Sequence, residues 1–112
     1  MFTTLFGKPR KQVDAVELHA LIEHPVNALF VDVREKEEWD DGHIEGFVHI
    51  PLALFYSRLG GFSPEKTIYL LCHSGGRSKR AQDALIDAGN ENVVNVTGGI
   101  AGWERAGYPI IR

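Results

Sequence analysis

Ile68-Tyr69-Leu70-Leu71-Cys72-His73-Ser74-Gly75-Gly76-Arg77-Ser78 is the stretch of sequence that decides the fold of this chain. Its first four residues form an apolar run that is typical of a buried strand, and small and apolar residues at helical spacing follow it. The two glycines allow a tight loop between these elements, because glycine adopts backbone conformations that other residues avoid. The stretch therefore predicts a strand over 67–71, a short loop with a thiol, and a helix over 78–88.

Elsewhere in the chain, short apolar runs alternate with helical patterns. The run from Ala28 to Val33 is apolar on both sides, which is typical of a central strand in a parallel sheet. Further strands are predicted at 2–6, 48–50 and 93–96, and helices at 14–23, 35–41, 52–59 and 98–104. This alternation predicts a single α/β domain over 1–112, with a mostly parallel central sheet flanked by helices on both faces.

The composition excludes several classes of function. The 112 residues carry a net charge of −3, so nucleic acid is not an expected partner, and the cluster of Lys8, Arg10 and Lys11 is interpreted as a solvated loop. No window approaches the roughly 20 apolar residues of a membrane helix, and residues 1–11 lack the apolar core of a secretory signal. The single cysteine fits a reducing compartment. We therefore expect a soluble, cytoplasmic protein with no membrane partner.

Cys72 is the candidate nucleophile, because it follows a predicted strand at the edge of the sheet where ligands bind in such folds. Gly75 and Gly76 allow the loop to direct backbone N–H groups inward, and the helix that begins near Ser78 adds its partial positive charge. Arg77 adds a full positive charge. Together these groups are expected to lower the pKa of the thiol by about a unit or more. The alternative is an inert cysteine in the core.

Other polar residues near the predicted loop are given structural roles. His73 is expected to contact ligands in the loop rather than to act as a general base, because neighbouring side chains at a strand end point apart. Asp32 and Arg34 are interpreted as a partly buried charge pair at the end of a central strand, with a general base at Asp32 as the alternative. Trp39 and Trp103 are expected to pack in or beside the core. The histidines show no metal-binding spacing, so neither a metal nor a cofactor is expected.

These residues resemble the rhodanese-like sulfurtransferases. The pattern Cys72-x-x-Gly75-x-Arg77-Ser78 is similar to the active-site loop of that family, and three further motifs occur in the order of the family over about residues 12–111. They are Val31-Asp32-Val33-Arg34-Glu35 with Trp39, Gly42-His43-Ile44-x-Gly46 with Ile50-Pro51, and Gly98-Gly99 with Trp103 and Gly107-Tyr108-Pro109-Ile110. The resemblance implies a rhodanese-like fold and places His43 near the site. Glu45 and Phe47 replace residues that commonly flank Gly46, so local packing and the wall of the cleft are expected to differ there.

The resemblance implies that Cys72 takes the outer sulfur of a donor such as thiosulfate or a persulfide and becomes a persulfide itself. Cyanide or a thiol would then accept the sulfur, and a protein thiol is an alternative acceptor. The resemblance also implies that residues 73–78, namely His73, Ser74, Gly75, Gly76, Arg77 and Ser78, contact the substrate. In this interpretation Arg77 would orient an oxyanion donor.

Two other functions remain open on the sequence alone. Rhodanese-like domains can also bind partners or carry sulfur without turnover, although the intact Cys72 favours chemistry. Cysteine-dependent phosphatases and arsenate reductases use a similar loop, but they place the arginine one residue further from the cysteine. The six residues from Cys72 to Arg77 leave room for one sulfur atom rather than for a phosphate, so a phosphatase-like enzyme is the less favoured alternative.

Overall fold

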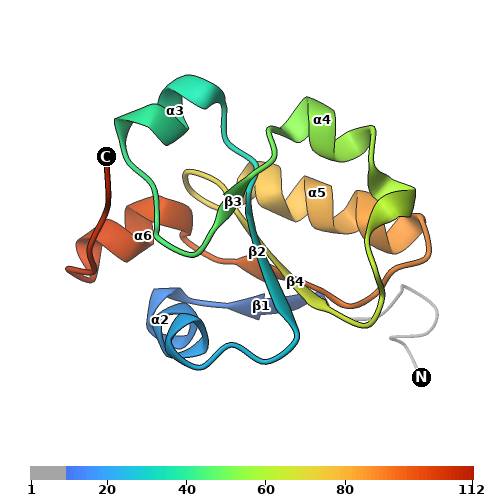
Figure 1. Ribbon diagram of the computed structural model, residues 1–112, viewed down its shortest axis with the longest axis horizontal. Coiled ribbons are helices and arrows are strands. Elements are labelled where there is room, and N and C mark those ends of the chain that lie inside the picture. The colour runs from blue at the N-terminus through green and yellow to red at the C-terminus, as the bar shows by residue number, and fades with distance from the viewer. Residues whose placement is uncertain (1–9) are drawn as a thin grey trace.

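A five-stranded parallel sheet forms the centre of the molecule (Figure 1). The computed structural model describes residues 10–112. The strands follow the spatial order β1-β5-β4-β2-β3, so β4 lies in the middle of the sheet. Their bounds are β1 Lys11–Val13, β2 Ala28–Asp32, β3 Val48–His49, β4 Thr67–Leu71 and β5 Val93–Val96.

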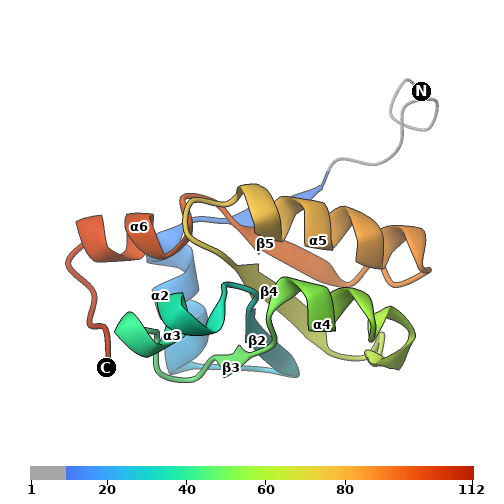
Figure 2. The ribbon, with the colours of Figure 1, turned by 90° about the horizontal axis from the view of Figure 1, so that it is seen from above.

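Helices cover both faces of the sheet (Figure 2). Helices α2 (Ala15–Glu23) and α6 (Gly99–Arg105) pack on one face, whereas α4 (Leu52–Tyr56) and α5 (Gly76–Asp87) pack on the other. The short helix α3 (Lys36–Asp41) follows β2, and a 3₁₀ turn at Leu59–Gly61 follows α4. These layers confirm the predicted α/β architecture, in which connections between parallel strands need to cross the faces of the sheet.

Alternation along β4 divides its side chains between two apolar clusters. Ile68, Leu70 and Cys72 belong to the cluster beneath α4 and α5, whereas Tyr69 and Leu71 belong to the cluster beneath α2 and α6. Because both faces are covered, the strand is apolar on both sides, as the sequence indicated. Burial on two faces fixes the register of β4, and therefore the position at which Cys72 leaves the sheet.

Three details of the secondary structure differ from the prediction. Strand β1 was not predicted at 11–13, because two of its three residues are exposed and no apolar alternation marks it; the strand predicted at 2–6 lies outside the described residues. Helix α5 begins at Gly76 rather than at 78, since the chain turns into the helix directly after Gly75. Helix α4 ends at Tyr56 rather than near 59. Within residues 10–112, no helix has the length and apolar character needed to cross a membrane.

Candidate active site

Cys72 leaves the carboxyl end of the central strand β4 and lies at the floor of a tight loop. Its side chain has an exposed fraction of 0%. The sulfur accepts hydrogen bonds from the backbone N–H groups of Gly75 at 3.1 Å and Ser78 at 3.3 Å, and it lies 3.3 Å from the Ser78 hydroxyl oxygen. The loop therefore surrounds the sulfur with polar hydrogens, as the glycine-rich sequence indicated.

Gly75 makes this turn possible. Its φ of +107° lies in the left-handed region, which residues with a side chain rarely adopt. A Cβ at this position would also lie 3.4 Å from the backbone nitrogen of Gly98. With Gly75 as the N-cap, α5 starts one residue later, and the Ser78 N–H in its first turn points back at the sulfur. The first-turn N–H groups of Gly76 and Arg77 have no acceptor within the helix, because the helix begins there.

The pKa of the Cys72 thiol lies below its ordinary value. Burial is the largest single influence and raises the pKa, because it disfavours the charged thiolate. Hydrogen bonds from the Ser78 hydroxyl and from the N–H groups of Ser78, Gly75 and Ser74 lower the pKa, and together they outweigh the burial. The thiol is therefore both buried and acidified, which an inert core cysteine would not be.

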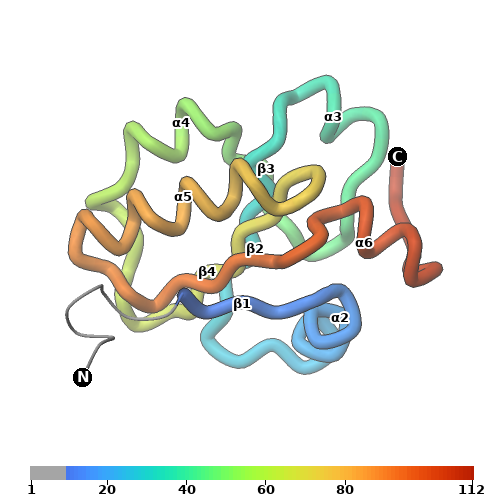
Figure 3. Tube along the Cα trace, turned by 180° about the vertical axis from the view of Figure 1, so that it is seen from behind, coloured from blue at the N-terminus to red at the C-terminus, as the bar shows by residue number. Residues whose placement is uncertain are grey.

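The N-terminus of α6 lies beside the loop that carries the thiol (Figure 3) and is hydrogen-bonded to it. The N–H of Ile100 donates to the Cys72 carbonyl at 2.9 Å, and the N–H of Ala101 donates to the His73 carbonyl at 3.1 Å. Gly99, with a φ of +58°, approaches so closely that a Cβ would lie 2.4 Å from the His73 carbonyl oxygen. The Gly98-Gly99 motif therefore positions the loop through α6.

Asn95 is a site residue that the sequence analysis missed. It is buried in β5, where its amide oxygen accepts from the Ser78 hydroxyl at 2.6 Å and its amide nitrogen donates to the Gly75 carbonyl at 3.3 Å. Asn95 thus positions the turn and the Ser78 hydroxyl, whose single proton can be donated to Asn95 or to the sulfur but not to both at once. An asparagine inside the apolar run Val93–Val96 was the available signal, because a buried amide needs polar partners.

Asp32 and Arg34 form the predicted charge pair. The Arg34 guanidinium donates through Nε and Nη2 to the Asp32 carboxylate at 2.8–3.0 Å, and the side chains are 0% and 6% exposed. The remaining donors reach the backbone carbonyls of Glu38 at 3.2 Å and Gly42 at 2.7 Å. The pair therefore fastens α3 and the following turn to the end of β2, which favours the structural role over a general base.

The Arg77 side chain is paired with a residue that the sequence analysis did not single out. Its Nη1 and Nη2 donate to the two carboxylate oxygens of Glu38 at 2.8 and 2.9 Å. Glu38 belongs to α3, so this ion pair joins α3 to the first turn of α5. Within residues 10–112, no hydrogen bond joins the Arg77 guanidinium to the Cys72 sulfur.

His43 and the two tryptophans have packing roles beside the site. Trp39 is stacked between His43 and His49, with ring centroids 3.7 and 4.9 Å away. The Nδ1 of His43 lies 2.9 Å from the Trp39 carbonyl and must donate to it, because a carbonyl oxygen only accepts. Trp103 is buried and donates to the Pro109 carbonyl at 2.8 Å. These contacts stabilise the turn after α3 and the C-terminal segment.

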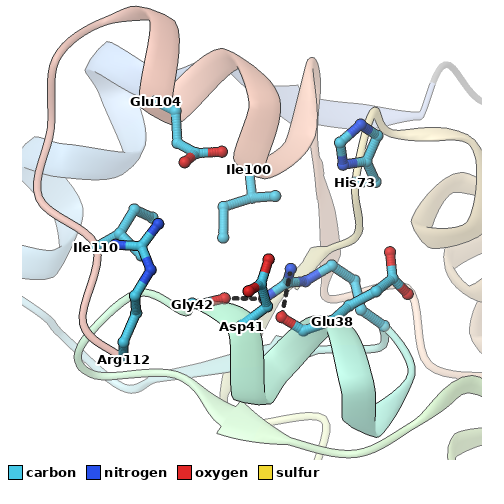
Figure 4. A pocket seen from close by; sticks show the side chains of 9 residues that line it. Glu38, Asp41, Gly42, His73, Ile100, Glu104, Ile110 and Arg112 are labelled. Atoms are coloured by element: carbon cyan, nitrogen blue, oxygen red, sulfur yellow. Dashed lines mark hydrogen bonds between the residues drawn. The ribbon is translucent and has the colours of Figure 1, made fainter.

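A polar cavity of about 290 Å³ lies beside the loop (Figure 4). His73 forms part of its wall, exposed and without a side-chain hydrogen bond in the part of the chain that the structure describes. Figure 4 shows the carboxylates of Asp41 and Glu104 and the guanidinium of Arg112 directed into this space. The cavity offers room for a ligand next to the loop, with acidic side chains in its wall.

The two departures from the family pattern lie away from the loop. Phe47 is buried in the cluster beneath α2 and α6, where its ring lies 5.4 Å from that of Phe30. Glu45 is exposed and lines a separate groove of about 230 Å³ next to Trp103. Neither residue lines the cavity beside Cys72. In residues 10–112, no three His, Cys, Asp or Glu side chains are grouped as a metal site requires.

The fold and this loop define a rhodanese-like domain, and the profile of that domain matches residues 14–106. The chain belongs to this family, which confirms the resemblance seen in the motifs. Sulfur transfer is the chemistry of the family and of its sulfurtransferase members.

Several known proteins are similar to this chain. A sulfurtransferase of Allochromatium vinosum is 30% identical over 100 residues, which cover 89% of this chain and 94% of that protein. YrkF of Bacillus subtilis, which its name describes as a candidate sulfur carrier, is 41% identical over 73 residues; these cover 65% of this chain but only 40% of YrkF. The crystal structure of a rhodanese-related protein from Thermoplasma volcanium superposes with a TM-score of 0.79 at 30% identity, covering 90% of this chain and 97% of that one.

Proposed function

We propose that this chain is a sulfurtransferase whose Cys72 accepts a sulfane sulfur from thiosulfate or an organic persulfide and passes it to a thiol or to cyanide. The observation that carries the proposal is the set of polar hydrogens around a buried, acidified sulfur. A persulfide is an anion near neutral pH, and the same N–H groups would stabilise it. No cofactor is needed for this exchange.

The proposed reaction has two displacement steps. The Cys72 thiolate attacks the outer sulfur of the donor, a new S–S bond forms, and the electron pair of the broken bond leaves with sulfite or with a thiolate. The acceptor then attacks the outer sulfur of the Cys72 persulfide and regenerates the thiolate. Cys72 is the only cysteine of the chain, so no second thiol can discharge the persulfide internally.

Intact mass spectrometry tests the proposal. The protein is incubated with thiosulfate and, separately, with cysteine persulfide, and then with cyanide. We expect a gain of one sulfur atom that cyanide removes as thiocyanate, and no gain for Cys72→Ala. If neither donor adds sulfur to the wild-type protein, the proposal is wrong. Hydrolysis of an aryl phosphate that depends on Cys72 would instead support the phosphatase-like alternative.

The similarity to YrkF supports a sulfur carrier as the second candidate function. The name of that relative describes a sulfur carrier, which is consistent with carriage to a protein thiol. In that case the persulfide would form readily, but its discharge to cyanide would be slow. The rates of loading and discharge, measured separately, distinguish the enzyme from the carrier.

A further inference from the structure

The Glu38–Arg77 pair occupies the position at which the resemblance places an oxyanion-binding arginine. Arg77 presents its two terminal nitrogens to Glu38 in a bidentate arrangement, at 2.8 and 2.9 Å. This geometry uses the edge of the guanidinium, with its two terminal N–H groups, that would otherwise bind a sulfonate or phosphate. The charge of Arg77 is therefore already balanced before a donor arrives.

Glu38 is held in place from its own helix. Its carboxylate accepts from the backbone N–H of Glu35 at 2.9 Å, in addition to the two bonds from Arg77. The hydrogen bond with Arg77 is the main reason that the pKa of Glu38 falls to about 2, so its charge is complete at neutral pH. A donor that binds through Arg77 must therefore displace the Glu38 carboxylate, which is already oriented and fully charged.

The remaining charges next to the loop do not replace Arg77 as an anion site. Arg34 in the wall of the cavity is bound to Asp32, and the carboxylates of Asp41 and Glu104 face the same space. Arg112 is the other cation of this wall, and it lies at the side of the cavity next to Ile110 (Figure 4). In the wall of the cavity, the carboxylates of Asp41 and Glu104 thus outnumber the guanidinium of Arg112, which disfavours a donor with concentrated negative charge.

We propose that Glu38 is a specificity-determining residue, which neutralises Arg77 and makes Cys72 accept sulfur from organic persulfides in preference to thiosulfate. This inference rests on the proposed sulfur transfer through Cys72. Thiosulfate carries two negative charges on a small group, whereas cysteine persulfide carries less net charge next to its sulfane sulfur. Because Glu38 neutralises Arg77, the first donor loses more attraction to the guanidinium than the second does.

Both donors deliver the same sulfur atom. With thiosulfate, the Cys72 thiolate bonds to the outer sulfur, the bond between the two sulfurs of thiosulfate breaks, and its electron pair leaves as sulfite. With cysteine persulfide, the protonated form of the donor reacts: the same attack releases the organic thiolate, and the proton then leaves to solvent, because the Cys72 persulfide is an anion near neutral pH. Neither reaction needs an oxidant or a reductant. A difference between the two rates therefore arises only from the donor and its leaving group.

The test compares the rates at which Glu38→Gln and wild type gain one sulfur from thiosulfate and from cysteine persulfide. We expect the variant to react about fivefold faster with thiosulfate, and its rate with cysteine persulfide to change less than about twofold. Glu37→Gln is the matched control, since it removes the same charge from an exposed neighbour on α3 that is not bonded to Arg77. The advantage of Glu38→Gln with thiosulfate should shrink as salt is added.

A second variant shows whether Glu38 acts through Arg77. In an Arg77→Gln background, Glu38→Gln should no longer change the preference between the two donors, because the charge that it released is gone. An unchanged preference in Glu38→Gln, or an equal change in Glu37→Gln, would overturn the inference. The proposed function would survive that outcome, since it fails only if wild type gains sulfur from neither donor.

Discussion

Two arginine–carboxylate pairs lie within the same region of the molecule, and they differ in burial. Asp32 and Arg34 are 0% and 6% exposed, and every side-chain hydrogen bond that Arg34 makes within residues 10–112 ends on Asp32 or on a backbone carbonyl. Glu38 and Arg77 are 33% and 26% exposed and join two helices at the rim of the loop. The buried pair therefore secures the shape of the site, whereas the rim pair can respond to a ligand and contributes little to stability.

The comparison also shows how the thiolate is stabilised. Both arginines are bonded to carboxylates, and within residues 10–112 neither guanidinium is hydrogen-bonded to the Cys72 sulfur. The donors that contact the sulfur are neutral groups of Gly75 and Ser78. The fold has already oriented these dipoles, so they stabilise the single negative charge of the Cys72 thiolate. They do not attract further negative charges to the site.

The largest expected effect is the loss of the buried pair. Asp32→Asn leaves the Arg34 guanidinium buried without its counter-charge, so we expect the free energy of unfolding to fall by about 3 kcal/mol. Urea unfolding measures the change. Asp40→Asn, which removes a carboxylate from an exposed pair with Lys36, is the control and should cost less than about 1 kcal/mol. Equal losses in the two variants would remove the distinction between buried and exposed pairs.

An intermediate effect is expected when a neutral hydrogen-bond donor to the Cys72 sulfur is removed. Ser78→Ala removes a hydrogen bond that lowers the pKa of Cys72, so that pKa should rise. The rise means that less thiolate is present at neutral pH. The ultraviolet absorbance of the thiolate against pH reports this directly, with Cys72→Ala as the blank, since the chain has no other cysteine.

Arg77→Gln is the matched comparison for Ser78→Ala. Because Arg77 is bonded to Glu38 and not to the sulfur, its removal should shift the pKa of Cys72 by less than half as much. A larger shift in Arg77→Gln than in Ser78→Ala would show that the charge of the arginine, rather than the dipoles, stabilises the thiolate.

The smallest expected effect is the change in the free energy of unfolding when the pair at the rim of the loop is broken. Glu38→Gln should lower the free energy of unfolding at neutral pH by about 0.5 kcal/mol or less, because the pair is partly exposed. The pKa of Glu38 is depressed from 4.5 to about 2, so its contribution is complete above about 4.5 and is lost as the pH falls towards 2. Urea unfolding of wild type and variant should therefore converge at acidic pH. A loss as large as that of Asp32→Asn would contradict the comparison.

The fold could be predicted because local patterns determine most of it. The apolar runs of β2, β4 and β5 are long enough to be recognised, and the glycines mark the loop at Cys72. Strand β1 escaped prediction because Val13 is its only apolar residue, and its pairing partner β5 is distant in the sequence. A strand of this kind is defined by its neighbour rather than by its own residues.

The position of Cys72 and its loop at the end of a strand could be predicted, whereas the residues that support the loop could not. Cys72, its loop and the Asp32–Arg34 pair could be found from the sequence, because the residues of each lie close together in the chain. Glu38 and Asn95 could not, since Glu38 meets Arg77 across 39 positions and Asn95 meets Ser78 across 17. Contacts of this range depend on the tertiary fold, which places α3, α5 and β5 around one point.

The hydrogen bonds from α6 to the Cys72 and His73 carbonyls have a consequence for synthesis of the protein. The loop of Cys72 leaves the ribosome well before Ile100 and Ala101, which provide those bonds. During that interval the thiol belongs to an unfinished sheet that lacks β5, Asn95 and the last helix. The cysteine is therefore least protected while the chain is being made, and it becomes enclosed when the C-terminal segment docks.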